Sequence, residues 1–279
     1  MPETQPFFLF PCEFTAGRFQ NFFIMSAPQQ LGEILRRVSV SDQDRQHRLF
    51  AITEQILTSS PQLQSADFTK LNPDDLQLIY ELYDDQFFGG LIQRSFDQQR
   101  MSFRVSSRMT RAGGKTTRWG DPRRPEQLKY EIAISSTLLF QSFQDPERPV
   151  TVTGIECVNR LEGLLRVMEH ELIHLAEMLV WSDSNCALHR FQGIAQRQFG
   201  HLQHTHNLLT PRELAHREYN IRAGSHVAFV LDGRRYEGIV NRITRRATVL
   251  VPDASGEPFS DGRRYLRFYV PIAQLESLD

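Results

Sequence analysis

The sequence predicts an α+β protein in which helices come first and a small all-β unit comes last. Apolar residues recur at helical spacing over residues 29–38 and 42–59. They alternate with polar residues over 101–105 and 130–134, which indicates two strands. Past Arg222 the chain becomes a series of short alternating segments separated by turn residues. This change of period predicts a second, β-rich domain.

Capping residues mark the helix starts in the first part of the chain. Ser41 can cap the helix over 42–59, and Asn72-Pro73 starts another helix with a capping side chain followed by proline. We expect that helix to end at Phe88-Gly89-Gly90. A glycine-containing basic stretch, 111–115, lies between the two predicted strands and suggests a hairpin there.

Further helices are expected in the middle of the chain. A long apolar helix over about 155–181 follows a proline-rich connection at 145–149, and a shorter helix follows at 189–199. Thr210 and Glu213 form a capping box that starts one more short helix.

The C-terminal segment, 222–279, is expected to form a small β-barrel of the SH3-like kind. Asp232-Gly233 is a strong hairpin turn signal. The predicted strands are 226–231, 236–243, 247–251 and 265–270. Barrels of this type bind nucleic acid or peptides, or pack against a neighbour, and the fold alone does not choose among these roles.

Composition excludes several classes of protein. The 279 residues are 40% hydrophobic, with a net charge of −1, which argues against wholesale disorder and gives no global signature of a nucleic-acid binder. No stretch approaches the roughly 18 apolar residues of a membrane helix, so we expect no membrane partner. Cys12, Cys157 and Cys186 form no disulfide framework, which favours a reducing, cytoplasmic compartment, with association with the nucleoid as an option.

Residues 1–25 are rich in phenylalanine but do not form a signal peptide. The first basic residue is Arg18, and the apolar run Phe7–Phe10 lies between two prolines and is too short for a signal sequence. The segment is interpreted as a tail, with Met25 as an alternative start of the protein. A docking peptide for a partner is the other interpretation.

The strongest chemical signal is His170-Glu171-Leu172-Ile173-His174, an HExxH motif. On a helix the two histidines lie on one face and can bind one metal ion, while Glu171 can accept a proton from the water that the metal activates. The surrounding leucines predict a buried helix. Two core histidines satisfied by hydrogen bonds are the alternative reading.

A third ligand distinguishes the subclasses of such sites. An HExxHxxGxxH pattern fails here, because Glu177 and Val180 stand where Gly and His are needed. His189 starts the next predicted helix beyond a polar loop, and a helix–loop–helix return can bring it to the first helix. That would complete a site of three histidines with the fourth position open, as catalytic zinc requires. The alternatives are His201, His204, His206 and Glu213.

An ordered series of segments over about residues 73–205 resembles the SprT family of zinc metalloproteases, which includes the DNA–protein crosslink protease Spartan. The matching segments are Tyr83–Leu91 with its aromatic-glycine turn, Ser106–Met109 followed by Ala112-Gly113, Ile132–Leu139, and His170–His174 followed by His189.

The resemblance implies a minigluzincin-like zincin fold with a small sheet over the active-site helix. It implies Zn²⁺ on His170, His174 and His189, with Glu171 as the general base. The chain departs from the family pattern at two positions: Val105 stands where the family often has Trp, and Arg190 where Gly often follows the third histidine. The cysteine-rich zinc ribbon of some members is absent, which leaves the handling of substrates less defined than metal binding.

A basic stretch from Arg104 to Lys129 carries eight basic residues against two acids. Basic side chains around an aromatic residue are typical of single-strand binding surfaces. A solvated hairpin without a ligand is the alternative. The candidate nucleic-acid contacts are Arg111, Lys115, Arg118, Trp119, Arg123 and Arg124.

The sequence therefore predicts a zinc metalloprotease that acts on proteins associated with DNA or crosslinked to it. The expected partners are a protein substrate and DNA, single-stranded or crosslink-bearing. The alternative is a nucleic-acid-associated binding protein whose zinc site is structural or inactive, and a different metal-dependent hydrolase is a third option. The predicted domains are a tail (1–25), a helical region (26–72), the metalloprotease domain (73–210) and the barrel (222–279).

Overall fold

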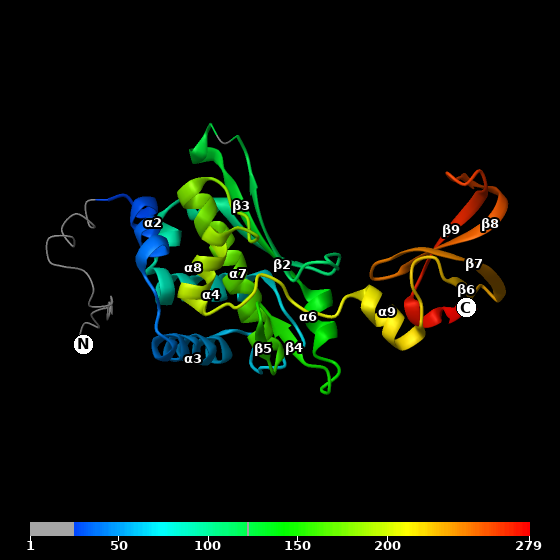
Figure 1. Ribbon diagram of the computed structural model, residues 1–279, viewed down its shortest axis with the longest axis horizontal. Helices are drawn as coiled ribbons and strands as arrows, with labels where there is room; N and C mark the ends of the chain where they lie inside the picture. The colour runs from blue at the N-terminus through cyan, green and yellow to red at the C-terminus, as the bar shows by residue number, and fades with distance from the viewer. Residues whose placement is uncertain (1–24, 122) are drawn as a thin grey trace. The chain divides into compact units, whose positions relative to one another are not determined.

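The computed structural model describes residues 25–121 and 123–279 and shows a mixed α+β protein made of two compact units (Figure 1). Unit 1 contains residues 25–105, 114–134 and 151–206 of the described chain, and unit 2 contains 106–113, 135–150 and 207–279. The predicted N-terminal tail lies outside the described residues, apart from its last residue. Over the described residues, no helix is long and apolar enough to cross a bilayer.

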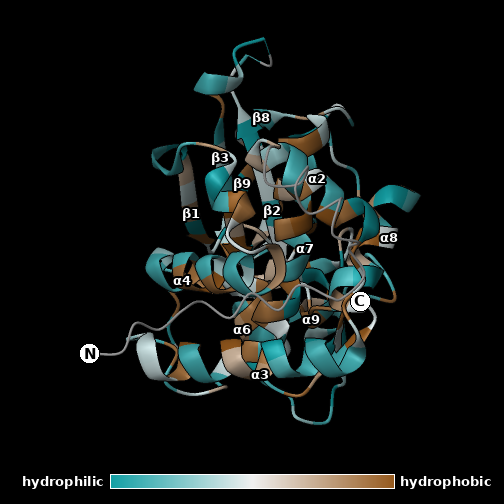
Figure 2. Ribbon diagram, turned by 90° about the vertical axis from the view of Figure 1, so that its left-hand side faces the viewer, coloured by the Kyte–Doolittle hydropathy of each residue, from teal (hydrophilic) through white to brown (hydrophobic). Residues whose placement is uncertain are grey.

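The N-terminal helices of unit 1 are confirmed together with the caps that start them. They are α2 (Ala27–Arg37), α3 (Asp42–Ser59) and α4 (Pro73–Tyr83). Ser41 accepts a hydrogen bond from the backbone of Asp44, and Asn72 forms a capping box with Asp75. In Figure 2 the ribbon of α3 is mostly hydrophilic, which agrees with the burial of only Ile52 and Ile56 among its residues.

Helix α4 continues into one π-helical turn and ends at the predicted glycine pair. The turn is η1 (Asp84–Phe88), and it is closed by Gly89, whose φ of 61° belongs to the left-handed region. The short helices α5 (Leu91–Arg94) and η2 (Gln98–Arg100) follow.

A three-stranded sheet in the order β1-β3-β2 corrects the predicted hairpin. The strands are β1 (Met101–Ser106), β2 (Gly114–Trp119) and β3 (Lys129–Ser135). The basic stretch 111–115 is not a turn that joins β1 to β3, because its last two residues start a strand of their own. The hairpin is formed by β2 and β3, which pair antiparallel and are joined by a loop with the 3₁₀ turn η3 (Pro125–Gln127).

The long central helix α7 (Arg160–Trp181) starts five residues later than predicted. Residues 155–157 form a strand instead, in a small two-stranded sheet of β4 (Val150–Val152) and β5 (Ile155–Cys157). Asn159 caps the helix by accepting a hydrogen bond from the backbone of Glu162. Within unit 1, α7 packs against β2, α2, α4 and α8 (His189–Phe199), so it forms the centre of the core.

Unit 2 contains two helices and a five-stranded antiparallel sheet in the order β10-β6-β7-β8-β9. The helices are α6 (Ser136–Ser142) and α9 (Pro211–Tyr219), the latter with the predicted capping box at Thr210. The strands and the last 3₁₀ turn are β6 (His226–Leu231), β7 (Arg234–Ile243), β8 (Ala247–Pro258), β9 (Arg264–Val270), η4 (Ile272–Gln274) and β10 (Glu276–Ser277).

The sheet of unit 2 is strongly curled. The ring of Phe229 on β6 lies 5.3 Å from that of Phe268 on β9, although two strands separate β6 and β9 in the sheet. The curl encloses an apolar core that includes Val227, Val240 and Val249.

Candidate metal centre

The two histidines of the HExxH motif lie one turn apart on α7 and point to the same place. The Nε2 atoms of His170 and His174 are 3.1 Å apart. Two nitrogens that share one tetrahedral zinc ion, each at about 2.0–2.1 Å, lie about 3.3 Å apart. The pair therefore has the spacing of two ligands of one ion.

Both imidazoles are in the neutral form that ligates metals. Burial is the main cause that lowers the pKa of His170 to about 3, with a further contribution from His174, and burial lowers the pKa of His174 to about 4. The ring of Phe191 on α8 lies 4.8 Å from the ring of His170 and 4.5 Å from that of His174, and so shields the pair from water.

A relay of hydrogen bonds fixes the orientation of His174. Its Nδ1 atom lies 2.7 Å from the hydroxyl of Ser184, and that hydroxyl donates to Glu177 at 2.6 Å. Because the serine proton is directed to Glu177, Nδ1 of His174 is the donor to Ser184, and Nε2 keeps its lone pair for a metal. Arg190 donates to the other oxygen of Glu177 at 2.7 Å. Arg190 stands where the SprT pattern often has glycine, and in this structure its contact with Glu177 anchors the relay.

Glu171, the predicted base, is buried between α7 and β2. The hydroxyl of Thr116 lies 2.8 Å from its Oε2 atom and 2.9 Å from its backbone carbonyl. Burial raises the pKa of Glu171 to about 7, against the opposing effect of the hydrogen bonds from Thr116. A carboxylate with a pKa near neutrality is suited to accept and return a proton.

Gly114 makes room for this carboxylate. A Cβ atom at position 114 would lie 2.6 Å from both Cγ and Oε1 of Glu171 and 2.8 Å from Cγ1 of Val167. Only a residue without a side chain allows β2 to approach α7 so closely. Gly114 had been interpreted as part of a turn, and its function in the site depends on a contact that the sequence pattern does not show.

The third donor beside the two histidines is a cysteine. Among the residues that the structure describes, His170, His174 and Cys186 form a group whose ligand atoms all lie within 4.8 Å of one another. Imidazole nitrogen and thiolate sulfur are ligands that zinc prefers, so the donor set fits this ion. Sequence reasoning treated Cys186 only as evidence for a reducing compartment.

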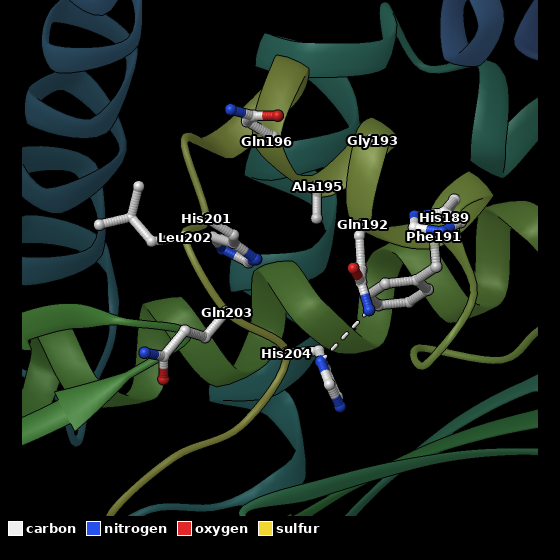
Figure 3. Close-up of a pocket in the computed structure, with 10 residues that line it drawn as sticks. All are labelled: His189, Phe191, Gln192, Gly193, Ala195, Gln196, His201, Leu202, Gln203 and His204. Carbon is white, nitrogen blue, oxygen red and sulfur yellow. Dashed lines mark hydrogen bonds between the residues drawn. The ribbon is translucent and has the colours of Figure 1, made fainter.

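His189 is not a member of this group. It is the first residue of α8 and is exposed, and it lines a cavity of about 320 Å³ with Phe191, Gln192, His201 and His204 (Figure 3). Phe191, which contacts both histidines of α7, also lines this cavity, whereas the two histidines and Cys186 do not. The assignment of His189 as a ligand remains a prediction.

The other candidate ligands have different surroundings. His201 is buried, and its Nε2 atom lies 2.8 Å from Glu169. His204 faces Gln192 at 3.3 Å, as the dashed line in Figure 3 shows. His206 forms a bridge to Val152, and Glu213 caps α9 in unit 2.

Glu169, next to the motif, is the centre of a buried polar cluster that holds α7 in the core. Arg166 donates to both of its oxygens at 3.0 Å, and the hydroxyl of Tyr83 donates to it at 2.9 Å. Burial alone would raise the pKa of Glu169, but Arg166 and His201 outweigh it and lower the pKa. The cluster is therefore an ion pair, with each oxygen of the carboxylate hydrogen-bonded.

The predicted nucleic-acid contacts are divided between two parts of the fold. Lys115, Arg118, Trp119, Arg123 and Arg124 belong to the β2–β3 hairpin of unit 1, whereas Arg111 lies in the loop after β1, in unit 2. Trp119 is 47% exposed, so its ring is available for stacking. Arg118 donates to the carbonyl of Ser182 at the end of α7, which gives this residue a structural contact.

No family model matches the chain, and neither the curated proteins nor the solved structures searched contain a match to it.

Proposed function

We propose that this chain is a cytoplasmic zinc-dependent endopeptidase of the SprT-like type, built on a zincin-like unit 1 and an SH3-like barrel in unit 2. The observation that carries the proposal is the pair of neutral imidazoles with Nε2 atoms 3.1 Å apart on the HExxH helix. The same separation allows a hydrogen bond between the two rings, which is the core-histidine alternative. The placement of both Nε2 atoms on one face of the HExxH helix, at the spacing of two ligands of one ion, supports a shared metal.

The residues around the pair have distinct roles in this proposal. His170 and His174 bind the metal, with Cys186 or the predicted His189 as the third ligand. Bound zinc supplies a Lewis acid that lowers the pKa of water from 15.7 toward about 7.

Glu171 takes the proton of the attacking water and returns it to the leaving amine, as its position beside the pair and its pKa of about 7 suit. Thr116 orients the carboxylate through Oε2.

The variant Glu171→Gln tests the mechanism. It keeps the shape of the side chain but removes the base, so we expect full zinc content and loss of cleavage of unfolded casein and of the chain itself, by at least about 100-fold. Zinc content and cleavage are measured on the same preparation. A variant that binds zinc and still cleaves at the wild-type rate would exclude this mechanism.

The substrate class is supported by the basic hairpin. Exposed Trp119 at the end of β2 and exposed Arg123 and Arg124 in the loop that follows it offer a ring for stacking and charges for phosphates. We therefore propose proteins associated with DNA or crosslinked to it as substrates. The alternative function, a binding protein with an inactive zinc site, predicts the same DNA affinity with no proteolysis.

Charge reversal in the β2–β3 loop tests whether this hairpin binds DNA. Arg123→Glu with Arg124→Glu is expected to weaken binding to a single-stranded oligonucleotide and to lower the salt slope of log K by about 1.4, because each phosphate contact on a single strand contributes about 0.7. Arg118 is left in place because it contacts Ser182. The control, Arg37→Glu with Arg212→Glu, makes the same change in net charge elsewhere. Equal affinity in the two double variants would remove the hairpin from the proposal.

A further inference from the structure

The outer face of the curled sheet in unit 2 carries an aromatic ring in line with an arginine. Three residues are paired across neighbouring strands: Arg242 on β7, Thr248 on β8 and Tyr269 on β9. Residues paired in this way point to the same face of a sheet. The residues next to them along the strands belong to the apolar core: Ile243, Ala247 and Val270. Since side chains alternate along a strand, the three paired side chains point outward.

A bulge in β7 directs Arg242 to this face. The pairing of β7 with β8 shifts between Val240 and Arg242, so Asn241 faces no partner residue on β8. Val240 is in the apolar core, and regular alternation would direct the side chain two residues later into the core as well. The extra residue reverses that direction, and bulges of this kind are common next to functional sites.

The turn from β7 to β8 adds positive charge at the same end of the sheet. Arg245 and Arg246 are exposed in this turn, which is closed by the backbone N–H of Thr244 donating to the carbonyl of Arg246 at 3.0 Å. Over its described residues, unit 2 forms its ion pairs with Arg217, Arg235 and Arg267. Arg242 and Arg246 take part in none of these pairs, so their guanidinium groups can meet an anionic partner.

The acidic residues of the neighbouring strands are neutralised within the sheet. Arg235 pairs with both Glu237 and Glu276, at 3.3 and 2.7 Å. Glu257 pairs with Arg267 at 2.9 Å. These carboxylates therefore do not offset the charge of Arg242 and Arg246.

The ring of Tyr269 is open to a flat ligand. The residue is 61% exposed, and its paired neighbour, Thr248, has a small side chain. Arg267, two residues earlier on the same face, lies over the ring of Phe259 at 5.6 Å. Its guanidinium is thus directed to another ring, and that of Tyr269 can stack with a base.

The combination of groups distinguishes between the classes of partner. An acidic peptide would use the arginines alone, and a proline-rich peptide binds in a groove lined by aromatic rings. A single nucleic-acid strand uses both features of this face, an exposed ring for a base and guanidinium groups for phosphates.

We propose that Arg242, Arg246 and Tyr269 form a surface that binds single-stranded nucleic acid, with a base stacked on Tyr269 and phosphates on the two arginines. This basic-aromatic surface contains no residue of the metal group and none of the β2–β3 hairpin. The inference therefore goes beyond the proposed protease activity and does not rest on it.

Fluorescence anisotropy of a labelled dT12 oligonucleotide on the full chain tests the stacking contact. Tyr269→Ala is expected to weaken binding at least about fivefold, which is the low end of the effect of removing one stacked base. The control is Val230→Ala, at a residue of β6 with the same exposure of 61%, and it is expected to bind as the wild type does. Equal affinities in the two variants would overturn the inference.

The salt dependence of the same binding tests the arginines. It is measured in the Arg123→Glu, Arg124→Glu background, so that the hairpin does not conceal the effect. Arg242→Ala with Arg246→Ala is expected to lower the salt slope of log K by about 1.4, since each phosphate contact on a single strand contributes about 0.7. The control, Arg37→Ala with Arg212→Ala, is expected to leave the slope unchanged. An equal slope in the two pairs, or no binding of dT12 in this background, would contradict the proposal.

Photocrosslinking does not depend on any variant. Wild-type chain is irradiated with dT12 that contains 5-bromodeoxyuridine, and the peptide that carries Tyr269 is expected among the adducts found by mass spectrometry. Adducts on the β2–β3 hairpin alone would overturn the inference. Displacement of the oligonucleotide by an equal concentration of decaglutamate would also overturn it, because the surface would then belong to acidic peptides.

Two further arms separate the sources of the ligand and the two proposals. A titration with rU12 beside dT12 shows whether RNA or DNA binds more tightly, and either order keeps the inference. A chelator-treated chain is expected to bind dT12 as the untreated chain does. Binding of dT12 by a chain that holds no zinc and cleaves no protein would refute the proposed function while keeping this surface.

Discussion

Gly114 on β2 sets how closely the sheet can approach the carboxylate of Glu171. The Cβ of Gly114→Ala would lie 2.6 Å from Glu171, so either the strand or the carboxylate has to move. We expect at least a tenfold loss of peptide cleavage with zinc content unchanged, and a destabilisation of about 1–3 kcal/mol from overpacking. Cleavage assays, zinc analysis and urea unfolding measure the three quantities.

The matched control for this variant is Thr117→Ala on the same strand, at a residue that alternates to the other face of the sheet. It is expected to cleave at the wild-type rate. Wild-type activity in Gly114→Ala would show that Glu171 does not need its observed position.

Ser184 fixes the tautomer of His174, and its removal should weaken metal binding. In Ser184→Ala, Nδ1 of His174 loses its acceptor and Glu177 loses a donor. Changes of this kind lower metal affinity by about 10–100-fold. Competition with a chromophoric chelator measures the zinc affinity, with Ser182→Ala, an exposed neighbour, as the control. Equal affinities in the two variants would exclude the relay.

The sequence predicted the site residues that belong to one motif on one helix. It did not predict the residues that tertiary contacts bring to that helix from other elements. His170, Glu171 and His174 follow from a single motif. Thr116 and Ser184 act through hydrogen bonds across elements, for which a single sequence has no periodic signal. Cys186 was not predicted as a candidate donor, because only the tertiary contact between the α7–α8 loop and α7 brings its sulfur near the two histidines.

Among the elements, helices with strong caps and strands with alternating apolar residues were predicted well, whereas β2, β4 and β5 were not predicted. Asn72, Ser41 and Thr210 start their helices as expected because the capping bond is local. β2 is a run of basic and small polar residues with no apolar alternation, so its strand depends on pairing with β3. The predicted helix included the residues of β5, because their apolar side chains continue the helical spacing of α7.

The π-turn after α4 contains a carboxylate whose titration should be visible in the stability of the fold. Asp84 is fully buried and accepts hydrogen bonds from the backbones of Ile92 and Gln93 at 2.9 and 2.8 Å. Burial raises its pKa from 3.8 to about 6, against the opposing effect of these bonds. The folded state therefore binds more protons than the unfolded state between about pH 4 and pH 6, and stability falls as the pH rises through that window.

Asp84→Asn should remove this dependence. Ionisation of Asp84 is expected to lower the free energy of unfolding of the wild type by an amount on the order of 2 kcal/mol between pH 4 and pH 7. Urea unfolding of both proteins across this range, with a chelator present, gives the difference in their pH profiles. Parallel profiles for the wild type and the variant would contradict the raised pKa.

For the whole molecule, charge neutrality hides an uneven distribution. The net charge of −1 gave no sign of a nucleic-acid partner, yet the stretch from Arg104 to Lys129 holds eight basic residues against two acids. The mixed α+β class and the strand-rich C-terminal part were predictable from the change of hydrophobic period at Arg222. The membership of residues 106–113 and 135–150 in unit 2 was not, since it depends on contacts distant in sequence.

The central claim, a metal held by the HExxH helix, is tested most directly by metal analysis of the purified chain. The wild type, His170→Ala and His174→Ala are each loaded with zinc, and excess zinc is removed by gel filtration. The zinc content of each protein is then measured by elemental mass spectrometry. We predict one zinc ion per chain in the wild type and less than about a tenth of that in either variant. A folded wild-type chain without zinc, or equal zinc in all three proteins, would contradict the account.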